Sequence, residues 1–236
     1  MNRFRYAALV LLTGVPASAQ DTDASPYDTR EESVENASAI KISGAIKATV
    51  ITGSEDASVR FQGPAEMVAD AQASVIDGLL TIGYRDDKTY SWNPSAGLNA
   101  VISLPSLSSV TTHGAAQVDV LGARGKAFSA TTNGAGRIKV AQLYVEHVNA
   151  AIGGSGKIEL EGHAEEARYA IGGAGSIEGK RLRVENAQIA IGGAGSVYAD
   201  VSDQAAISVG GSGKVEVVGG AKCTVSPEGA RNVECR

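Results

Sequence analysis

The sequence predicts an all-β protein formed by a single parallel β-solenoid, and two observations support this fold class. First, a glycine-rich motif typified by Asn133–Gly136 returns at steps of 18 to 20 residues, a period typical of repeat architectures. Second, apolar residues alternate with period two on both sides of each copy, which predicts strand, turn, strand. A coil of about 20 residues with two or three short strands is one rung of a solenoid, and its strands pair with those of the next rung roughly 4.8 Å away.

The glycines are expected to form tight corners, because a corner stacked on its equivalent requires positive φ and has no room for a Cβ atom. His113 and Asn133 open the first two copies, and both residue types tolerate the left-handed conformation. A phosphate-binding loop is not indicated, since strands and not a helix follow the glycines. Calcium-binding nonapeptides need a nine-residue period and an Asp after the glycines, and both are missing. The expected structural corner residues are Gly114, Gly134, Gly154, Gly173, Gly193 and Gly211.

The chain also resembles a known family from about residue 39 to residue 235. The similarity rests on Ile42–Ala45, on the Asp77–Gly78 hairpin signal followed by Leu79–Ile82, on Leu104–Pro105, and on the glycine repeats. These features resemble the bacterial head GIN domain family of putative auto-transporter adhesins. The resemblance implies a small, β-helical, extracytoplasmic protein and brings no catalytic residues with it.

Residues 1–19 are predicted to be a secretory signal peptide. Arg3 and Arg5 form its positive end, an apolar run follows, and Ala17–Ala19 forms a small-residue cleavage site. The apolar run is too short to span a bilayer, and no membrane span is expected after cleavage. The predicted location is therefore extracytoplasmic, in the periplasm or at the cell surface of a bacterium.

The rest of the chain is predicted to hold one domain. Residues 20–33 are acidic and without periodicity, and are expected to be a disordered leader. Residues 34–105 are expected to form irregular rungs and a cap, residues 106–218 the regular repeats, and residues 219–236 a C-terminal cap. Strands are expected at 46–52, 58–62, 74–76, 79–84 and 99–104, with one short helix between 64 and 72.

The charge balance narrows the class of partner. The formal net charge is −5, and removal of two arginines with the signal would make it −7. An acidic chain without basic clusters is a poor candidate for binding nucleic acid or anionic membranes. A protein or a cell-surface polysaccharide remains as the expected partner, a homo-oligomer is allowed, and no cofactor is expected.

Cys223 and Cys235 are the only cysteines. In an exported chain they are expected to form a disulfide that clamps the last rung. Closing a loop of this size contributes about 3 kcal/mol in the chain-entropy model. A metal site is the weaker interpretation, because two thiols without a nearby His leave a zinc site incomplete.

The longest expected loop, 86–97, carries Tyr90 and the single Trp92. One interpretation is an aromatic platform on which a sugar ring stacks. The other is a plug over the open end of the core.

Carbohydrate cleavage is the best case for an enzyme. Glu159 and Glu178 occupy one outward column in neighbouring rungs, which would place them near 5 Å apart, as in retaining glycosidases. The column also holds Asp, Lys and Tyr, as an ordinary solvated strand face does. We therefore expect a non-enzymatic adhesin-like or envelope scaffold protein, with a carbohydrate-binding or carbohydrate-cleaving β-helix as the alternative.

One row of outward residues differs from an ordinary solvated face, because its members are neither charged nor large. Such a flat strip favours close approach by another surface, although it is also explained if the N-terminal segment or a loop covers it. The members of this expected contact strip are Thr111, Thr131, Ala151, Ala170, Ala190 and Ser208.

Overall fold

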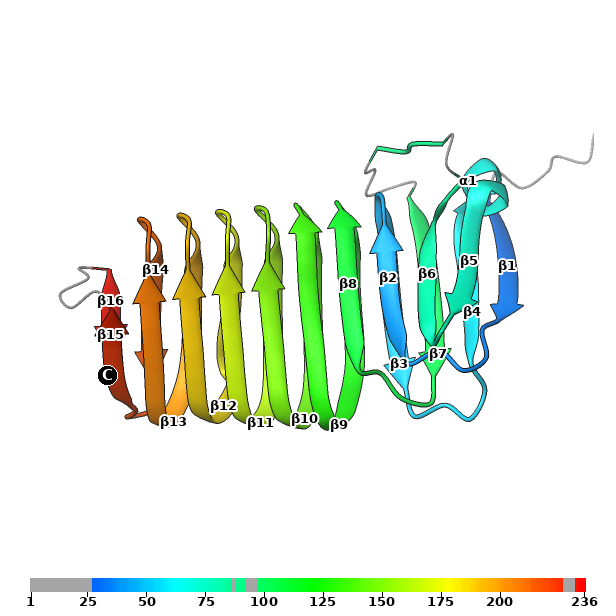
Figure 1. Cartoon of the computed structure of the whole chain (residues 1–236). Coiled ribbons are helices and arrows are strands. Elements are labelled where there is room, and N and C mark those ends of the chain that lie inside the picture. Colours follow the sequence, from blue (N-terminus) through cyan, green and yellow to red (C-terminus); the bar gives the residue numbers. More distant parts are fainter. Residues whose placement is uncertain (1–26, 86–87, 92–96, 227–231) are drawn as a thin grey trace, which may run out of the picture.

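The computed structural model describes residues 27–85, 88–91, 97–226 and 232–236. The chain forms a β-solenoid whose rungs stack side by side along one axis (Figure 1), which confirms the predicted fold class. The expected signal peptide, and residues 20–26 of the expected leader, lie outside the described residues.

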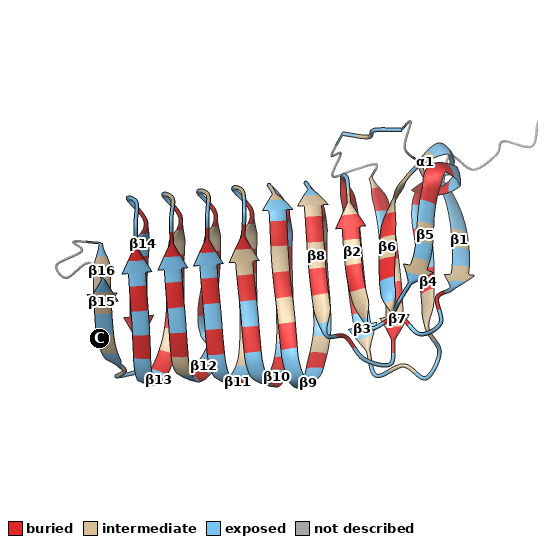
Figure 2. Cartoon of the chain, viewed as in Figure 1, coloured by how far each residue is buried: buried red, intermediate tan, exposed pale blue. Residues whose placement is uncertain are grey.

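Five long strands bend through the regular rungs, and each pairs in parallel with the next. The segments that follow the glycine corners form one wall, the post-corner sheet, and the segments that precede the next corner form the opposite wall, the pre-corner sheet. Buried and exposed residues alternate along the strands of both walls, visible as colour bands on the strands in Figure 2, as period-two strands require. The long strands are β9 (Gln117–Gly134), β10 (Arg137–Ile152), β11 (Lys157–Ile171), β12 (Ser176–Ile191) and β13 (Ser196–Val209).

The N-terminal region extends both walls. The post-corner sheet continues through β3, β7, β4 and β1, and the pre-corner sheet continues through β8, β2, β6 and β5. Of these strands, β1, β4 and β5 run antiparallel to the neighbours that link them to the wall, which explains the less regular pattern of this region. The bounds are β1 (Tyr27–Ser33), β2 (Ala39–Ser43), β3 (Ile46–Thr52), β4 (Ser58–Pro64), β5 (Ala71–Ile76), β6 (Leu79–Tyr84), β7 (Leu98–Leu104) and β8 (Ser109–Gly114).

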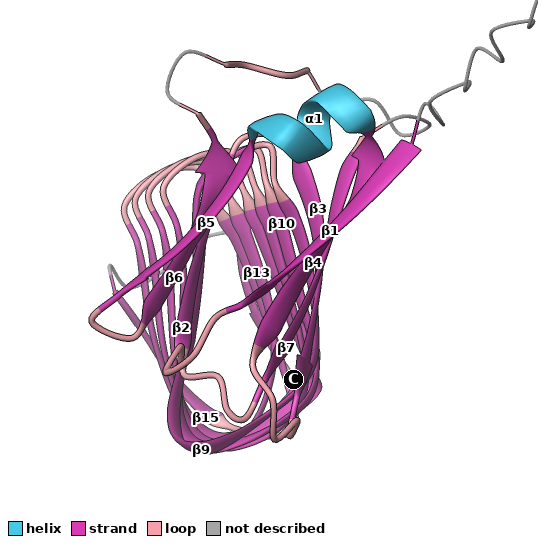
Figure 3. Cartoon of the chain, turned by 90° about the vertical axis from the view of Figure 1, so that its right-hand side faces the viewer, coloured by secondary structure: helices cyan, strands magenta, loops and turns pink. Residues whose placement is uncertain are grey.

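The expected short helix is present as α1 (Ala65–Asp70), with Pro64 at its N-cap position. It lies across the N-terminal end of the solenoid, between the ends of the two walls (Figure 3). The expected disorder of the acidic leader is wrong for residues 27–33, which form β1. The segment pairs antiparallel with β4 along its whole length, and Arg30 anchors it further: its guanidinium lies 5.2 Å from the Phe61 ring centroid and donates hydrogen bonds to the carbonyls of Val68 and Ala71. Nothing in the local charge pattern indicates that anchor.

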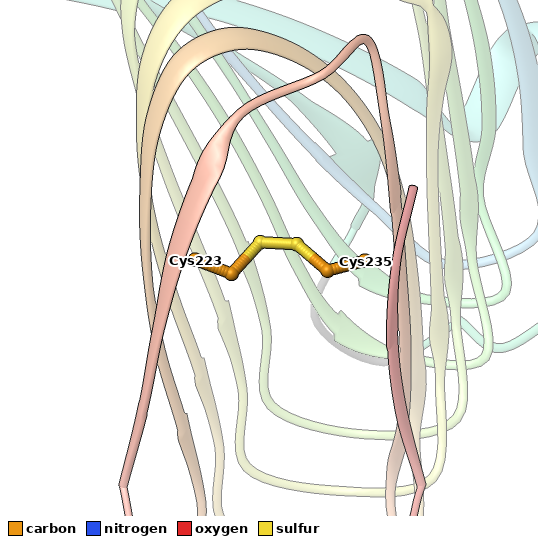
Figure 4. The surroundings of a disulfide bond; sticks show 2 residues. All are labelled: Cys223 and Cys235. Carbon is orange, nitrogen blue, oxygen red and sulfur yellow. A yellow bond between two sulfur atoms is a disulfide. The ribbon is translucent and has the colours of Figure 1, made fainter.

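The C-terminal end continues both walls for one further rung. The strands β14 (Lys214–Val218) and β16 (Val233–Cys235) extend the post-corner sheet, and β15 (Lys222–Ser226) extends the pre-corner sheet. Cys223 and Cys235 form the predicted disulfide, which joins the two walls across the last rung (Figure 4), with the Cα atoms 6.6 Å apart. Residues 227–231, between β15 and β16, lie outside the described residues.

The corner glycines are explained by crowding more than by conformation. A Cβ atom built on Gly193 would lie 2.1 Å from the carbonyl oxygen of Gly173 in the preceding rung, and Gly134, Gly154, Gly173 and Gly211 are crowded in the same way. The expected positive φ is present only at Gly114 (78°) and Gly134 (149°), and it is absent at the other four corner positions and at His113 and Asn133. The stacking of successive corners therefore excludes a side chain even where the backbone angle would accept one.

A second glycine column was not anticipated. A Cβ atom on Gly156, Gly175 or Gly195 would lie 2.4 to 2.6 Å from the carbonyl oxygen of its equivalent one rung earlier. Both ends of each corner are thus pressed against the neighbouring rung.

Candidate contact face

The strand register aligns the expected contact strip. Its six members are paired one to the next across β8, β9, β10, β11, β12 and β13. Ala170, Ala190 and Ser208 are exposed, and Thr111, Thr131 and Ala151 are half-buried. Within the described part of the chain no segment pairs over this wall from outside.

The strip belongs to a larger surface, which we call the neutral face. It comprises two adjacent outward rows on the ten strands of the pre-corner sheet, and only Lys41 and Arg168 among its members are charged. One row contains Ser74, Thr81, Lys41, Thr111, Thr131, Ala151, Ala170, Ala190, Ser208 and Ser226. The other contains Ile76, Leu79, Ala39, Ser109, Ser129, Asn149, Arg168, Gln188, Ala206 and Thr224.

Sequence reasoning missed the part of the neutral face on β2, β5 and β6, because these strands fall outside the glycine repeats. The signal was nevertheless present. Thr81 stands between the apolar residues Leu80 and Ile82, as Ala170 stands between Tyr169 and Ile171. Period-two alternation alone would have placed it outward.

A shallow hollow of about 500 Å³ lies over the C-terminal half of the neutral face. Its floor includes Ala170, Ala190 and Ser208, and the longer side chains of Arg168 and Gln188 also line it. The hollow exists because three successive rungs place small side chains at one position. A partner can therefore approach the backbone of these strands more closely than on a face of long side chains.

The opposite, post-corner wall is charged and internally neutralised. Its outward column reads Asp119, Lys139, Glu159, Glu178, Tyr198 and Glu216. Arg137 and Lys157 lie 2.9 Å and 3.1 Å from Glu159, and Lys180 lies 2.9 Å from Glu216. This is an ordinary solvated strand face, and it contrasts with the neutral face across the core.

The two carboxylates considered for catalysis are cross-strand partners, as expected: Glu159 pairs with Glu178. Partial burial acts to raise the pKa of Glu159, but hydrogen bonds and charges from Arg137 and Lys157 outweigh it, so that the pKa is lowered. Lys157 also lies 3.9 Å from Glu178. A glycosidase needs one carboxyl whose pKa is raised so that it can act as general acid, and the pKa of Glu159 is shifted in the opposite direction.

Tyr90 contacts two residues of the N-terminal region, Asp70 and Tyr84. Its hydroxyl donates a 2.7 Å hydrogen bond to Asp70, and its ring centroid lies 4.6 Å from that of Tyr84. The hydrogen bond to Asp70, followed by desolvation, raises the pKa of Tyr90 to about 12. Arg85 pairs with the same carboxylate at 3.2 Å. Trp92, the other aromatic residue of this expected site, lies outside the described residues.

The histidines do not belong to any metal-binding cluster among the described residues. His147 and His163 are exposed, as expected, and His147 lies 3.4 Å from Glu166. Among the described residues, no group of three or more His, Cys, Asp or Glu side chains could hold a metal ion. No helix in the described part of the chain is long and apolar enough to cross a membrane.

Solved structures with a similar fold include proteins of Bacteroides and Parabacteroides species. A Bacteroides fragilis NCTC 9343 protein described as a "putative adhesin" has a TM-score of 0.75 and 21% identity, with 90% of this chain and 94% of that chain covered. A "putative lipid binding protein" of Parabacteroides distasonis ATCC 8503 has a TM-score of 0.69 and 14% identity, with 86% of this chain and 93% of that chain covered. A "putative adhesin" of Parabacteroides merdae ATCC 43184 has a TM-score of 0.61 and 19% identity, with 90% of this chain and 94% of that chain covered. No protein of curated function matches the sequence.

The sequence comparison agrees with this fold. The family profile described as "Putative auto-transporter adhesin, head GIN domain" matches residues 37–221, which include most of the described rungs. The chain therefore belongs to the head GIN domain family.

Proposed function

We propose that this chain is a non-enzymatic, extracytoplasmic interaction protein of the adhesin or envelope-scaffold type, and that the neutral face binds its partner. The observation that carries the proposal is the contrast between the charged column of the post-corner wall and the neutral face of the pre-corner wall. One wall is laced with ion pairs, while twenty outward positions on the other include two charged residues.

The physical reason is the cost of desolvation. Covering a charged side chain costs far more free energy than covering Ser, Thr or Asn, whose hydroxyl and amide groups a partner can satisfy with hydrogen bonds, and Ala has no polar side-chain group to desolvate. Small side chains also give up little rotamer freedom. A broad, rigid sheet with these properties can be covered at low cost, and solvated sheet surfaces normally carry charge instead.

The location is supported by the disulfide between Cys223 and Cys235, since such bonds persist in oxidising compartments. The signal-like residues 1–19 and the family's adhesin description agree with export. Periplasm and cell surface are both compatible with these features, and fractionation of the native cells distinguishes them.

Polysaccharide binding is the second candidate. The hydroxyl and amide groups of Ser109, Ser129, Asn149 and Gln188 lie in one row of the neutral face, with Arg168 between the last two. Such groups can hydrogen-bond to sugar hydroxyls. A glycan array tests this binding, and a reducing-sugar assay on the same glycans tests cleavage.

The main experiment uses the double variant Ala170→Arg with Ala190→Arg, which places two charges on the floor of the hollow. The matched control is Ala174→Arg with Ala194→Arg, which makes the same change at exposed corner positions of the same two rungs. For each purified protein we measure the melting curve and the binding to envelopes of the producing cells. If the glycan array identifies a ligand, binding to that glycan is measured as well.

The proposal predicts that the neutral-face variant melts like wild type and loses binding at least tenfold, while the corner variant keeps both. Equal binding by the two variants would refute the neutral face as the contact surface. Unfolding of the neutral-face variant would instead indicate that another segment of the chain covers the strip.

A further inference from the structure

The edge strand β5 is the one uncharged free edge among the described strands. It pairs only with β6, and its sequence Ala71–Ile76 contains no charge and no proline. The other free edges carry charge, with four charged residues on β1, Lys222 on β15 and Glu234 on β16. Charges on edge strands prevent pairing with other chains, so β5 lacks the protection that the other edges have.

The backbone groups on this edge can be assigned. Asp77 and Gly78 have positive φ and form the two-residue turn to β6, so Ile76 and Leu79 are the hydrogen-bonded closing pair. Residues of the other parity therefore point their N–H and C=O groups away from β6. The hydrogen bond from Arg30 to the Ala71 carbonyl, on the side away from β6, agrees with this assignment. Ala73 and Val75 consequently present unpaired donors and acceptors along the free edge.

A hollow lies beside this edge. It has a volume of about 480 Å³ and is lined by Ala71–Ser74 of β5, by Arg30 and Glu32 of β1, and by Arg85. Arg30 of β1 reaches the Ala71 carbonyl at one end of the edge, whereas Ala73 and Ser74 line the hollow. At the end of the same strand, Ile76 is 69% exposed, the highest value among the exposed large apolar residues.

We propose that two copies of this chain pair through β5, antiparallel about a two-fold axis at Ser74. In this register Ala73 of each copy exchanges both hydrogen bonds with Val75 of the other copy, and the Ser74 residues of the two copies lie opposite each other. Ile76 lies opposite Gln72, and no charged residue opposes another. A two-fold contact brings the same surface of both copies together. An uncharged edge can meet a copy of itself without repulsion between like charges, whereas a charged edge brings its charges close to the same charges of the other copy.

The pairing joins the neutral faces of two copies into one continuous sheet. It uses only one six-residue strand per copy, well below the roughly 800 Å² per partner of a standard interface. The dimer is therefore weak and concentration-dependent in solution, and becomes significant where copies are concentrated on one surface. This inference does not depend on which partner the neutral face binds.

The test is cross-linking by a cysteine at the axis. In the proposed register the two Ser74 Cα atoms form a non-hydrogen-bonded pair about 4.5 Å apart, within the range that a disulfide spans. Ser74→Cys is compared with Thr81→Cys, at the position that pairs with Ser74 on β6. In the proposed dimer the two residues at position 81, one in each copy, are three strand spacings apart. The native cysteines are already joined to each other, so the added thiol is the reactive one.

We expect Ser74→Cys to form covalent dimers at least tenfold faster than Thr81→Cys, at a rate that rises with protein concentration. Adding Ala73→Pro removes one outward N–H without touching the β6 ladder, and should reduce the rate to that of the control. Equal rates for the two cysteine variants would overturn the proposal, as would a fast rate that survives Ala73→Pro.

Sedimentation at high concentration checks the same point without cysteine chemistry, and it decides if Ala73→Pro does not fold. Ser74→Lys should lower the dimer fraction, while Thr81→Lys should not. A dimer unaffected by Ser74→Lys would show that the copies associate elsewhere, and a wild-type chain that stays monomeric at every concentration would also refute the pairing. Both measurements use the purified chain alone, so their failure leaves the test of partner binding untouched.

Discussion

Replacing Gly193 by alanine would drive a methyl group into the rung before it. The new Cβ atom would lie 2.1 Å from the Gly173 carbonyl oxygen, whereas real contacts essentially never fall below 3.0 Å, so the two corners must separate by about 0.9 Å. That oxygen also accepts a 3.0 Å hydrogen bond from the Ala194 N–H, which the separation would stretch. Overpacking costs about 1–3 kcal/mol and a weakened hydrogen bond about 1 kcal/mol, so the free energy of unfolding should fall by about 2–4 kcal/mol.

The adjacent residue supplies the control. A Cβ atom on Gly192 would have its nearest neighbour 3.9 Å away, at the Ile171 carbonyl oxygen, and neither glycine has positive φ. Gly192→Ala should therefore change stability by about 0.5 kcal/mol or less, and Gly192→Asn should also be tolerated. Thermal melts followed by circular dichroism should separate Gly193→Ala from wild type by about 4–16 °C. Gly193→Val should be worse still. If Gly193→Ala and Gly192→Ala melt together, crowding between corners does not explain the repeated glycines.

Three further changes test the core and the C-terminal clamp. Thr132→Val should stabilise the fold by about 1 kcal/mol in denaturant titration, because the Thr132 hydroxyl is fully buried without a partner; a loss of stability would reveal a hidden partner. Gly179→Val should destabilise clearly, since even a Cβ atom there would lie 3.0 Å from the buried Tyr169 hydroxyl, and adding Tyr169→Ile should recover much of the loss; a double variant no better than the single one would rule out this packing explanation. Cys223→Ser should speed hydrogen exchange in β15 before the middle rungs, and uniform exchange would show that the Cys223–Cys235 bond does not hold the end.

The repeat made most of the fold predictable from the sequence. The period of about 20 residues predicts the rungs, and the period-two alternation predicts which residues point inward and which form the outward strip. Both patterns are readable because every rung must pack against neighbours of the same shape. The end regions lack that redundancy. β1 pairs with β4, about 30 residues further along the chain, and its Arg30 contacts the carbonyl of Ala71, 41 residues away, and no local pattern encodes these partners. The corner angles differed from expectation for a related reason, since stacking of one rung on the next, and not the turn itself, excludes the side chain.

Thiol labelling in the native envelope tests the central claim most directly, because it requires no knowledge of the partner. Ala170→Cys places a single reactive thiol on the neutral face, and Ala174→Cys places one at an exposed corner of the same rung; the native cysteines are already joined. Each variant is labelled with a maleimide probe in intact envelopes and again after purification. The account predicts that the thiol at position 170 is protected in the envelope and labelled in the purified protein, while the thiol at position 174 is labelled in both. Equal labelling of the two thiols in the envelope would contradict the claim that the neutral face is the surface that meets a partner.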